Sequence, residues 1–243
     1  MCIWEGAVND FMGNTMLELE SLTAAYSGSK VLFGVDITAR KGEITCLIGR
    51  NGVGKSTTMK AIMGLVKTPS GDIKVDGKSI FDLPSYSRAK AGIGYVPQGR
   101  EIFPQLTVKE NILLGMEANP KVKEIPSHIF ETFPILREFL ERRGGDLSGG
   151  QQQQLAIARA IVSEPKVLIL DEPTEGIQPS VIQEIGRVIT KLKKDMAILM
   201  VEQYLEFVLE VSDRCYVMEK GRISMSGKTD ELDKDRLQQL LSM

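Results

Sequence analysis

Residues 49–56 read Gly49-Arg50-Asn51-Gly52-Val53-Gly54-Lys55-Ser56. A short apolar run at 45–48 precedes them, of the kind found in strands buried on both faces. The segment that follows, 55–66, has apolar residues at helical spacing. A strand, a glycine-rich turn and a helix in this order begin a βαβ unit, and the pattern G-x-x-x-x-G-K-S/T in that setting predicts a loop that binds phosphate groups.

The residue types in this loop explain the prediction. Glycines allow backbone N–H groups to point inward at an anion, and the start of the following helix presents its positive dipole end to the phosphates. Lys55 is then expected to reach the β- and γ-phosphates, and the Ser56 hydroxyl to bind Mg²⁺. The sequence therefore predicts a site for a nucleoside triphosphate. Its expected contacts are Gly49, Arg50, Asn51, Gly52, Val53, Gly54, Lys55, Ser56 and Thr57.

A pair of carboxylates, Asp171 and Glu172, directly follows the apolar residues 167–170. A buried strand that ends in this way delivers its acids to the carboxyl edge of the sheet, where open α/β folds bind their ligands. We expect Asp171 to hold Mg²⁺ opposite Ser56. Glu172 is expected to orient or deprotonate the water that attacks the γ-phosphate.

A second expected helix start carries a capping residue and two glycines. Ser148 is a suitable N-cap, and Gly149 and Gly150 leave the N–H groups of the first turn accessible before Gln151. One triphosphate cannot easily use two such helix starts of the same chain. We therefore expect residues 148–151 to bind the γ-phosphate that another subunit holds.

Strand and helix patterns alternate along the chain, which predicts an α/β fold with a mainly parallel sheet covered on both faces. Strands are expected at 17–22, 31–49 (with turn residues at Gly34, Lys41 and Gly42), 73–75, 93–96, 167–170 and 197–201, and a hairpin at 215–224. Helices are expected at 55–66, 109–115, 129–132, 135–143, 151–162, 180–194, 204–211 and 234–241.

The expected domain organisation is simple. Prolines interrupt the helical pattern between 98 and 147, so a small helical lobe at about 99–150 is predicted to be inserted in the core. Residues 1–15 show neither a strand nor a helix period and are predicted to be a loose extension, either a short tail or a stretch upstream of a start at Met16. A single domain is expected over 16–243.

Composition excludes several classes of protein. The 243 residues contain 30 Lys+Arg and 32 Asp+Glu, and the net charge of -2 argues against a protein that coats nucleic acid. No uncharged apolar run is long enough to span a bilayer, and the first residues lack the pattern of a secretory signal. Three cysteines are too few and too scattered for a disulfide framework, and the single histidine, His128, makes a Ser-His-Asp hydrolase improbable. A GTPase is disfavoured because the sequence lacks the guanine-specific pattern Asn-Lys-x-Asp.

Taken together, these elements resemble the ATP-binding subunits of ABC transporters over residues 16–243. Residues 49–56 resemble the Walker A loop of that family, 147–151 its signature sequence, and 168–172 its Walker B strand with the catalytic glutamate. The resemblance implies an ATPase with an additional antiparallel β lobe. It also implies a role for Gln98, near Mg²⁺, the attacking water and the contact with the membrane subunits. Tyr26 matches the aromatic residue that stacks on adenine, although a tyrosine at a strand end can also pack on the core.

Finer details are similar to one branch of the family. Residues 96–104, 142–147 and 172–180 resemble the second ATP-binding subunit of urea importers, which belong to the wider class of branched-chain amino acid importers. This likeness implies a second ATP-binding subunit, two transmembrane permease subunits and an extracytoplasmic solute-binding protein as partners, with the chain at the cytoplasmic face of the membrane. The transported solute could be urea, a short amide or a branched-chain amino acid. A homodimer remains open as well as a heterodimer.

Two positions depart from the common family pattern. Gln203 stands where many members have a histidine that contacts the γ-phosphate, and Gln178 stands where an aspartate is frequent. A glutamine amide can donate a hydrogen bond but carries no charge. Gln203 could be a substituted catalytic residue or only a polar residue at a helix start. Gln203 therefore leaves open an ATP-binding subunit without turnover. A soluble ABC-type ATPase without a transport role is a separate alternative to a transport ATPase.

Overall fold

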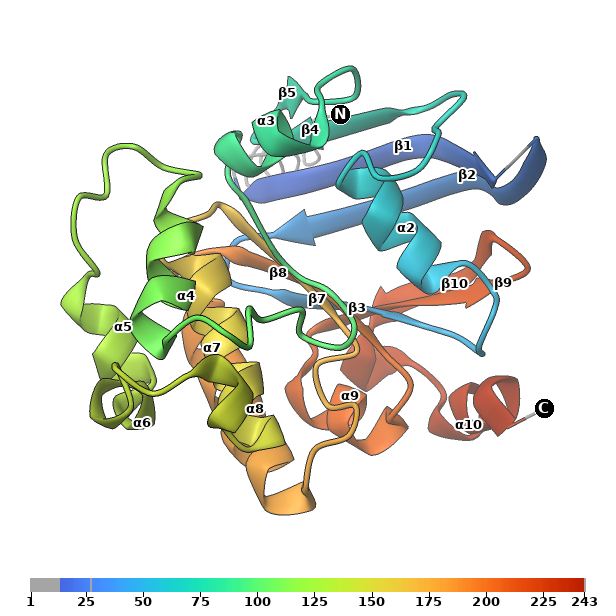
Figure 1. Ribbon diagram of the computed structural model, residues 1–243. Coiled ribbons are helices and arrows are strands. Elements are labelled where there is room, and N and C mark those ends of the chain that lie inside the picture. Colours follow the sequence, from blue (N-terminus) through green and yellow to red (C-terminus); the bar gives the residue numbers. More distant parts are fainter. Residues whose placement is uncertain (1–13, 27, 243) are drawn as a thin grey trace, which may run out of the picture.

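The computed structural model describes residues 14–26 and 28–242, and two sheets organise them (Figure 1). An antiparallel sheet has the order β2-β1-β4-β5, and a six-stranded sheet has the order β10-β9-β3-β8-β7-β6. The strands are β1 (Thr15–Tyr26), β2 (Ser29–Arg40), β3 (Ile44–Ile48), β4 (Asp72–Val75), β5 (Lys78–Ser79), β6 (Ile93–Val96), β7 (Val167–Asp171), β8 (Ala197–Glu202), β9 (Arg214–Glu219) and β10 (Arg222–Lys228). In the larger sheet β9, β3, β8, β7 and β6 are parallel, and β10 pairs antiparallel with β9.

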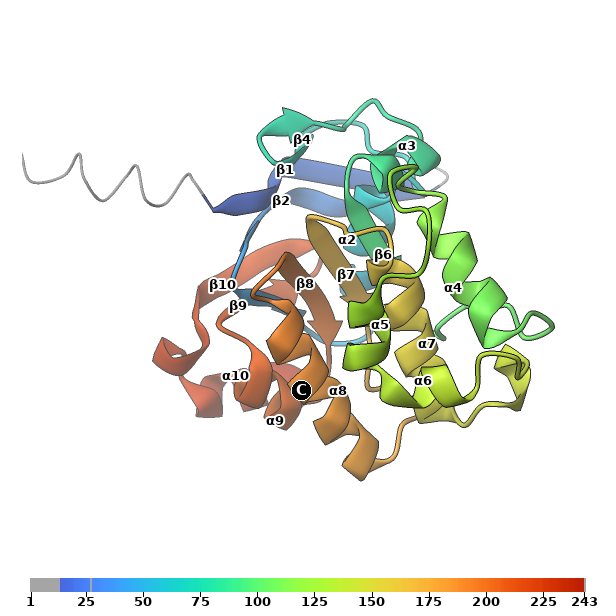
Figure 2. The same ribbon diagram turned by 90° about the vertical axis from the view of Figure 1, so that its left-hand side faces the viewer.

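Helices lie on both faces of the larger sheet. They are α2 (Lys55–Ile62), α3 (Ser85–Lys90), α4 (Val108–Met116), α5 (Ser127–Thr132), α6 (Pro134–Glu138), α7 (Gly149–Ile161), α8 (Pro179–Leu192), α9 (Leu205–Val211) and α10 (Lys234–Ser242), with 3-10 turns at Gly144–Asp146 and Thr229–Glu231. Helix α2 lies on the side of the antiparallel sheet, and α7, α8 and α9 lie on the other side. Figure 2 shows α7, α8 and α9 below the larger sheet, and β1, β2 and β4 above it. The predicted α/β class, with parallel strands and an antiparallel lobe, is confirmed.

The central strands are buried on both faces, as their apolar runs predict. Every residue of β3, β7 and β8 is buried. Cys46 and Ile48 of β3 belong to the core beneath the helices, whereas Leu47 belongs to the core beneath the antiparallel sheet. This alternation divides the hydrophobic core into two layers with the larger sheet between them.

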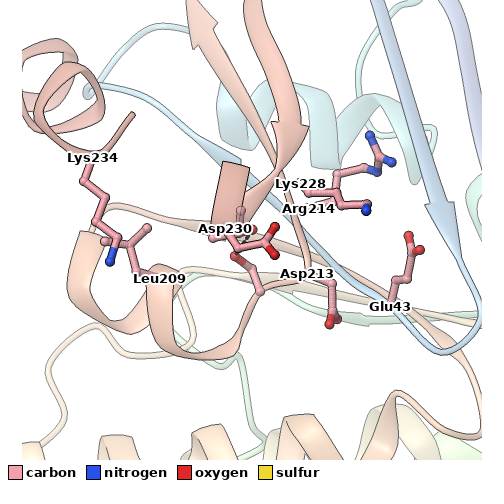
Figure 3. A pocket seen from close by; sticks show the side chains of 9 residues that line it. Glu43, Leu209, Asp213, Arg214, Lys228, Asp230 and Lys234 are labelled. Atoms are coloured by element: carbon pink, nitrogen blue, oxygen red, sulfur yellow. Dashed lines mark hydrogen bonds between the residues drawn. The ribbon is translucent and has the colours of Figure 1, made fainter. Parts of the chain in front are cut away.

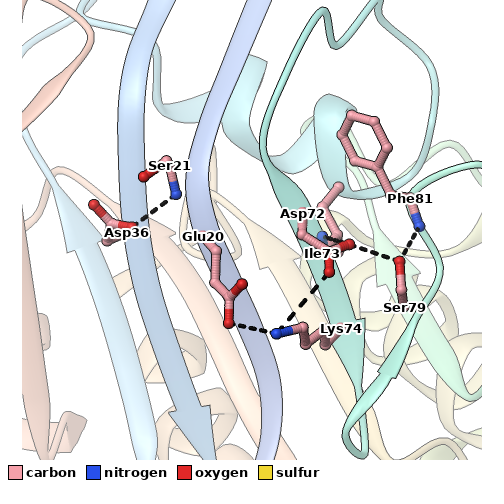
Figure 4. Close-up of polar contacts among 8 residues, drawn as sticks. All are labelled: Glu20, Ser21, Asp36, Asp72, Ile73, Lys74, Ser79 and Phe81. Carbon is pink, nitrogen blue, oxygen red and sulfur yellow. Dashed lines mark hydrogen bonds and ion pairs between the residues drawn. The ribbon is translucent and has the colours of Figure 1, made fainter.

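Polar contacts on the outer side of the antiparallel sheet fix its register (Figure 4). Lys74 of β4 forms an ion pair with Glu20 of β1. Ser21 has a left-handed φ of 46° within an irregularity of the β1–β2 register, and its N–H donates to Asp36 Oδ1 over 2.7 Å. Because a shift of one residue would turn every side chain to the other face, these contacts help keep the apolar face on the larger sheet.

Helix α2 is shorter than predicted, since it ends at Ile62 rather than at 66. Gly64 adopts a left-handed φ of 69°, and the guanidinium of Arg88 donates to the carbonyls of Ala61 and Ile62 at 2.9 and 2.8 Å. Arg88 lies on α3, a helix that the sequence analysis does not predict, and its side chain is buried. The Arg88 side chain thus donates to the carbonyls that would accept hydrogen bonds from a further turn of helix α2.

Other predicted boundaries also need correction. Strand β2 continues through Gly34, which has a φ of 78° but makes no chain reversal there. Helix α6 ends at Glu138 rather than at 143. Thr15 is predicted to be the last residue of the loose extension, but it pairs with Arg40 in the antiparallel sheet. The predicted boundary of the extension at residue 15 is therefore too far along the chain. Residues 1–13 of the extension lie outside the described residues.

Helices α4 and α7 of the helical region pack closely at Gly115. A Cβ atom at this position would lie 2.0 Å from the carbonyl oxygen of Arg159 and 2.7 Å from the Val162 side chain. No side chain larger than hydrogen fits there without a shift of one helix. Glycine is therefore required at this crossing by packing rather than by its backbone angles.

The exchange Gly115→Ala is expected to lower the free energy of unfolding by about 1–3 kcal/mol because it overpacks this crossing. In an unhindered helix the same exchange stabilises by up to about 1 kcal/mol, so the sign of the effect is diagnostic. Chemical denaturation followed by circular dichroism measures it. Leu114→Ala, on an exposed side chain of the same helix, is the control and should change stability by about 0.5 kcal/mol or less. A Gly115→Ala protein as stable as the wild type would contradict the close packing.

Candidate nucleotide-binding site

The loop between β3 and α2 is shaped by contacts with strand β9 and with the turn between β9 and β10. A Cβ atom at Gly49 would lie 2.5 Å from the carbonyl oxygen of Met218, which only a glycine avoids. The N–H of Gly221 donates to the carbonyl of Val53 over 2.8 Å. The predicted loop therefore lies between a strand and a helix, as expected. It packs against the β9–β10 hairpin, which is distant in sequence.

Lys55 is the first residue of α2 and lies beneath this loop. Its Nζ donates to the carbonyls of Gly49 and Arg50 at 2.8 and 3.0 Å, and its side chain is buried. Burial lowers the pKa of Lys55, while the nearby charges of Glu172 and Asp171 oppose that shift. No acidic residue and no side-chain cap occupies the first turn of α2, so the N–H groups at its start are available to an anion.

A cavity of about 240 Å³ opens beside the loop. Its lining joins the loop and the start of α2 to two residues from distant segments. The lining residues are Asn51, Gly52, Gly54, Lys55, Ser56, Thr57, Gln98 and Glu172. All eight residues are expected at the site from the sequence, and they come from three separate segments of the chain, at 51–57, 98 and 172.

Ser56 and Asp171 lie next to each other at the base of this site. The Ser56 hydroxyl donates to Asp171 Oδ1 over 3.2 Å. Burial raises the pKa of Asp171 to about 6, and the Ser56 hydrogen bond opposes the shift. Mg²⁺ in nucleotide sites is typically held by one or two carboxylates together with phosphate oxygens, and this hydroxyl and carboxylate fit such an ion. Residues 14–26 and 28–242 contain no cluster of three or more His, Cys, Asp or Glu side chains that would suit an ion without a phosphate.

Glu172 is held between two glutamine amides. Gln98 Nε2 donates to Glu172 Oε2 over 3.1 Å, and Gln203 Nε2 donates to Glu172 Oε1. Glu172 itself has a left-handed φ of 53°, and its N–H donates to the carbonyl of Val201 over 2.9 Å. The structure therefore brings together the three residues that the sequence analysis assigns to catalysis, and gives Gln203 a direct contact with one of the others.

A buried carboxylate, Glu202, joins the segments that carry Glu172 and Gln203, and the sequence analysis missed it. Glu202 accepts hydrogen bonds from the N–H and the hydroxyl of Thr174 at 3.0 and 2.8 Å and from the N–H of Gln203 at 3.1 Å. Burial raises the pKa of Glu202, and the hydrogen bonds from Thr174 oppose that shift. The only signal in the sequence is a charged residue at the end of an apolar strand, which does not distinguish it from an exposed one.

The structure does not bring Ser148–Gln151 or Tyr26 to the lining of the cavity. Ser148 is the N-cap of α7, as predicted, and forms a capping box with Gln151, whose N–H donates to Ser148 Oγ. Tyr26 ends β1 with 43% of its surface exposed, so it is not packed into the core. Gln178 is the exposed residue before α8 and makes no side-chain cap. The start of α7 is thus accessible but separate from the phosphate loop of its own chain.

A larger cavity, of about 570 Å³, lies at the opposite edge of the six-stranded sheet (Figure 3). It is lined by residues next to the amino ends of β3 and β9, among them Glu43 and Arg214. Its charged side chains comprise three acids and three bases: Glu43, Asp213 and Asp230, and Arg214, Lys228 and Lys234. This cavity shares no lining residue with the phosphate-loop cavity and contains no part of the glycine-rich loop.

A phosphate loop between β3 and α2, with two acids at the end of β7, defines the class of protein as a phosphate-loop nucleoside triphosphatase. Residues 32–175 match the family described as ABC transporter. The chain belongs to this family, and it is an ATPase that binds ATP. ATP-binding subunits of ABC importers work as dimers together with permease subunits.

Relatives and solved structures agree with this assignment. The chain is 41% identical over 221 residues to a probable branched-chain amino acid transport ATP-binding protein, LivF, of Archaeoglobus fulgidus, covering 89% of this chain and 94% of the relative. It is 40% identical over 213 residues to the high-affinity branched-chain amino acid transport ATP-binding protein BraG of Pseudomonas aeruginosa, covering 86% and 91%. It is 34% identical over 227 residues to the lipopolysaccharide export ATP-binding protein LptB of Haemophilus influenzae, covering 91% and 94%.

Among solved structures, a nucleotide-free ATP-binding cassette from an ABC transporter aligns with a TM-score of 0.80 at 29% identity and covers 94% of this chain and 96% of that one. Another cassette, in its ADP conformation, aligns with a TM-score of 0.78 at 30% identity, covering 94% and 95%. Within residues 14–26 and 28–242, no helix combines the length and the apolar character needed to cross a bilayer.

Proposed function

We propose that the chain is the ATP-hydrolysing subunit of an importer of the branched-chain amino acid class. The observation that carries this proposal is the Glu172 carboxylate, which lines the phosphate-loop cavity while two glutamine amides hold its oxygens. The partners would be a second ATP-binding subunit and two permease subunits that span the membrane, with an extracytoplasmic solute-binding protein that delivers the solute. The relatives at 41% and 40% identity, named for branched-chain amino acid transport, support this class.

Within the class, a branched-chain amino acid is the first candidate solute and urea, or a short amide, the second. The names of those relatives favour the amino acid, and the likeness of residues 96–104, 142–147 and 172–180 to urea-importer subunits favours urea. The test is uptake of labelled leucine and of labelled urea by cells with and without the chain. We expect leucine uptake to be lost on deletion. Loss of urea uptake instead assigns the second solute, and two unchanged rates would overturn the transport role.

The geometry of the site supports a role for each of its residues in this proposal. The backbone of the phosphate loop and the start of α2 bind the ATP phosphates, and Lys55 turns from the loop carbonyls to the β- and γ-phosphates. Ser56 and Asp171 hold Mg²⁺ with Gln98 beside them, and that ion supplies charge neutralisation on the phosphates when bound. Glu172 orients the attacking water and accepts its proton, and Gln203 keeps the carboxylate in position.

The start of α7 serves the nucleotide of the partner subunit. Ser148, Gly149, Gly150 and Gln151 are accessible at the helix start and stand away from the cavity of their own chain. Two such half-sites, one from each subunit, enclose each ATP, and Tyr26 stacks on its adenine. Residues 16–243 act in this proposal as a single ABC ATPase domain that binds to the permease subunits at the cytoplasmic face of the membrane.

Two alternatives give different experimental results. A soluble ABC-type ATPase without a transport role would hydrolyse ATP equally well with and without the permease subunits. An ATP-binding subunit without turnover would bind ATP but release no phosphate in a single-turnover experiment with its partner. The ordinary pair of acids after β7 and the contact of Gln98 with Glu172 favour hydrolysis over the second alternative.

The variant Gln203→Ala tests whether Gln203 takes part in catalysis. We expect kcat for ATP hydrolysis by the assembled complex to fall about fivefold, because loss of one hydrogen bond to Glu172 raises the activation free energy by about 1 kcal/mol. The KM for ATP should stay within about twofold, since Gln203 does not line the cavity. Gln183→Ala, an exposed glutamine on α8, is the matched control. An unchanged kcat for Gln203→Ala would mean that Gln203 is only a polar residue at a helix start.

A further inference from the structure

Arg100 lies where three segments of the candidate site meet. It follows Gln98 by two residues, and its Nε donates to Gln153 Oε1 of α7 over 3.3 Å. Its Nη2 donates over 3.0 Å to the carbonyl of Glu175, three residues after Glu172. A Cβ atom at Gly149 would lie 3.5 Å from Arg100 Nη1 and one at Gly176 3.6 Å from Nη2, so the guanidinium lies against the backbone of both segments.

The backbone around Arg100 is held in an unfavourable conformation. Arg100 and Glu101 have left-handed φ values of 70° and 46°, and each costs roughly 1 kcal/mol for a residue with a side chain. The N–H of Arg100 donates to the carbonyl of Pro97 over 3.0 Å, and its own carbonyl accepts from Arg159 Nη2 of α7 over 3.2 Å. Strain of this kind persists only where surrounding contacts impose it. Contacts with α7 therefore hold both the backbone and the side chain of Arg100.

The chemistry of the guanidinium suits a link between two elements. Its donors form a rigid planar fork, so one side chain can donate in two fixed directions, whereas the ammonium of lysine is a single point of charge. One acceptor, Gln153, has a buried side chain in α7, and the other is a backbone carbonyl in the loop that begins at Glu172. Arg100 thus links α7 directly to the loop that begins at Glu172.

We propose that Arg100 is a positioning residue that couples the two ATP sites of the dimer. The inference rests on the proposed function, in which the start of α7 serves the ATP of the partner subunit while Glu172 serves the ATP of its own chain. When residues 147–151 close on the partner's nucleotide, helix α7 shifts. Arg100 then shifts the loop after Glu172 and the segment that carries Gln98. Hydrolysis at one site then depends on occupancy of the other.

The test measures ATP hydrolysis by the assembled complex as a function of ATP concentration. For Arg100→Lys we expect the Hill coefficient to fall toward 1 and kcat to fall about tenfold, because lysine keeps the charge but loses the fork. Binding of ATP to the isolated subunit and its thermal midpoint should match those of the wild type. Arg137→Lys, at an exposed arginine of α6 that lies over the Phe130 ring of α5, is the matched control and should change none of these values.

A second variant separates coupling from a general loss of structure. Gln153→Leu removes the acceptor on α7 but leaves the Glu175 carbonyl, so it should also lower the Hill coefficient, and Arg100→Lys combined with Gln153→Leu should lower it no further than the stronger single variant. A wild-type Hill coefficient of 1, fully additive effects, or an Arg100→Lys enzyme equal to wild type would each overturn the inference. Glu172→Gln is measured in parallel, because hydrolysis that survives this exchange overturns the proposed function itself, whatever the Arg100 variants do.

Discussion

A complex that carries Glu172→Gln is expected to bind ATP and to bring its two ATP-binding subunits together, yet to hydrolyse ATP about 10²–10⁴ times more slowly. General base catalysis by a positioned carboxylate contributes acceleration of this size, and an amide of the same shape cannot accept the proton of the attacking water. In the wild type, Gln98 Nε2 and Gln203 Nε2 each donate a hydrogen bond to a different oxygen of the Glu172 carboxylate. The side-chain amide of the variant has only one oxygen that can accept from them. Phosphate release and nucleotide-dependent dimerisation, measured on the same preparation, separate turnover from binding.

The control for this exchange is Glu164→Gln. Glu164 is exposed and precedes β7, whereas Glu172 follows the same strand, so the two glutamates differ chiefly in the end of the strand at which they lie. Glu164→Gln should hydrolyse ATP at the wild-type rate. Turnover of the Glu172→Gln complex within about threefold of wild type would show that another group activates the water.

The second large effect is expected from Lys55→Ala, which should weaken ATP binding to the isolated subunit by about 100-fold. Hydrogen bonds to charged groups contribute about 1.5–3 kcal/mol, and Lys55 is the lysine that lines the phosphate-loop cavity. The folded state should lose little stability, because the exchange also removes the cost of burying an ammonium group whose pKa is already lowered by burial. Titration calorimetry measures the affinity, and thermal unfolding without nucleotide measures the stability.

Lys60→Ala provides the comparison for Lys55→Ala. Lys60 lies on the same helix, α2, but is exposed and does not line the cavity. Its removal should leave ATP affinity within about twofold. If Lys55→Ala bound ATP as tightly as Lys60→Ala, the phosphate contact assigned to Lys55 would be incorrect.

Features that depend on local pattern could be predicted from the sequence. The apolar run of β3, the glycine loop and the spacing in α2 lie together in the chain, and burial on both faces of a parallel strand leaves a continuous apolar stretch. The acids after β7 were predicted for the same reason. The capping box of Ser148 and Gln151 is equally local, because both hydrogen bonds join residues three apart.

Features that depend on distant contacts could not be predicted. Gln203 meets Glu172 because β8 lies beside β7 in the sheet, and no local pattern states that order. The early end of α2 depends on Arg88, a residue 26 positions after Ile62 whose helix, Ser-Tyr-Ser-Arg-Ala-Lys, has no apolar period. The contact of Glu202 with Thr174 likewise spans 28 positions. Buried polar side chains of this kind look like exposed ones until the fold brings their partners near.

The contact of Gly49 with the carbonyl of Met218, and of Val53 with the N–H of Gly221, has a consequence for biosynthesis. The loop is translated early, but the turn that supports it leaves the ribosome about 170 residues later, after most of the polypeptide has been made. A nascent chain that is halted before that turn contains the whole glycine-rich motif but lacks the β9–β10 hairpin against which the loop packs. Such a chain should therefore gain affinity for ATP only when its C-terminal hairpin is added, late in synthesis.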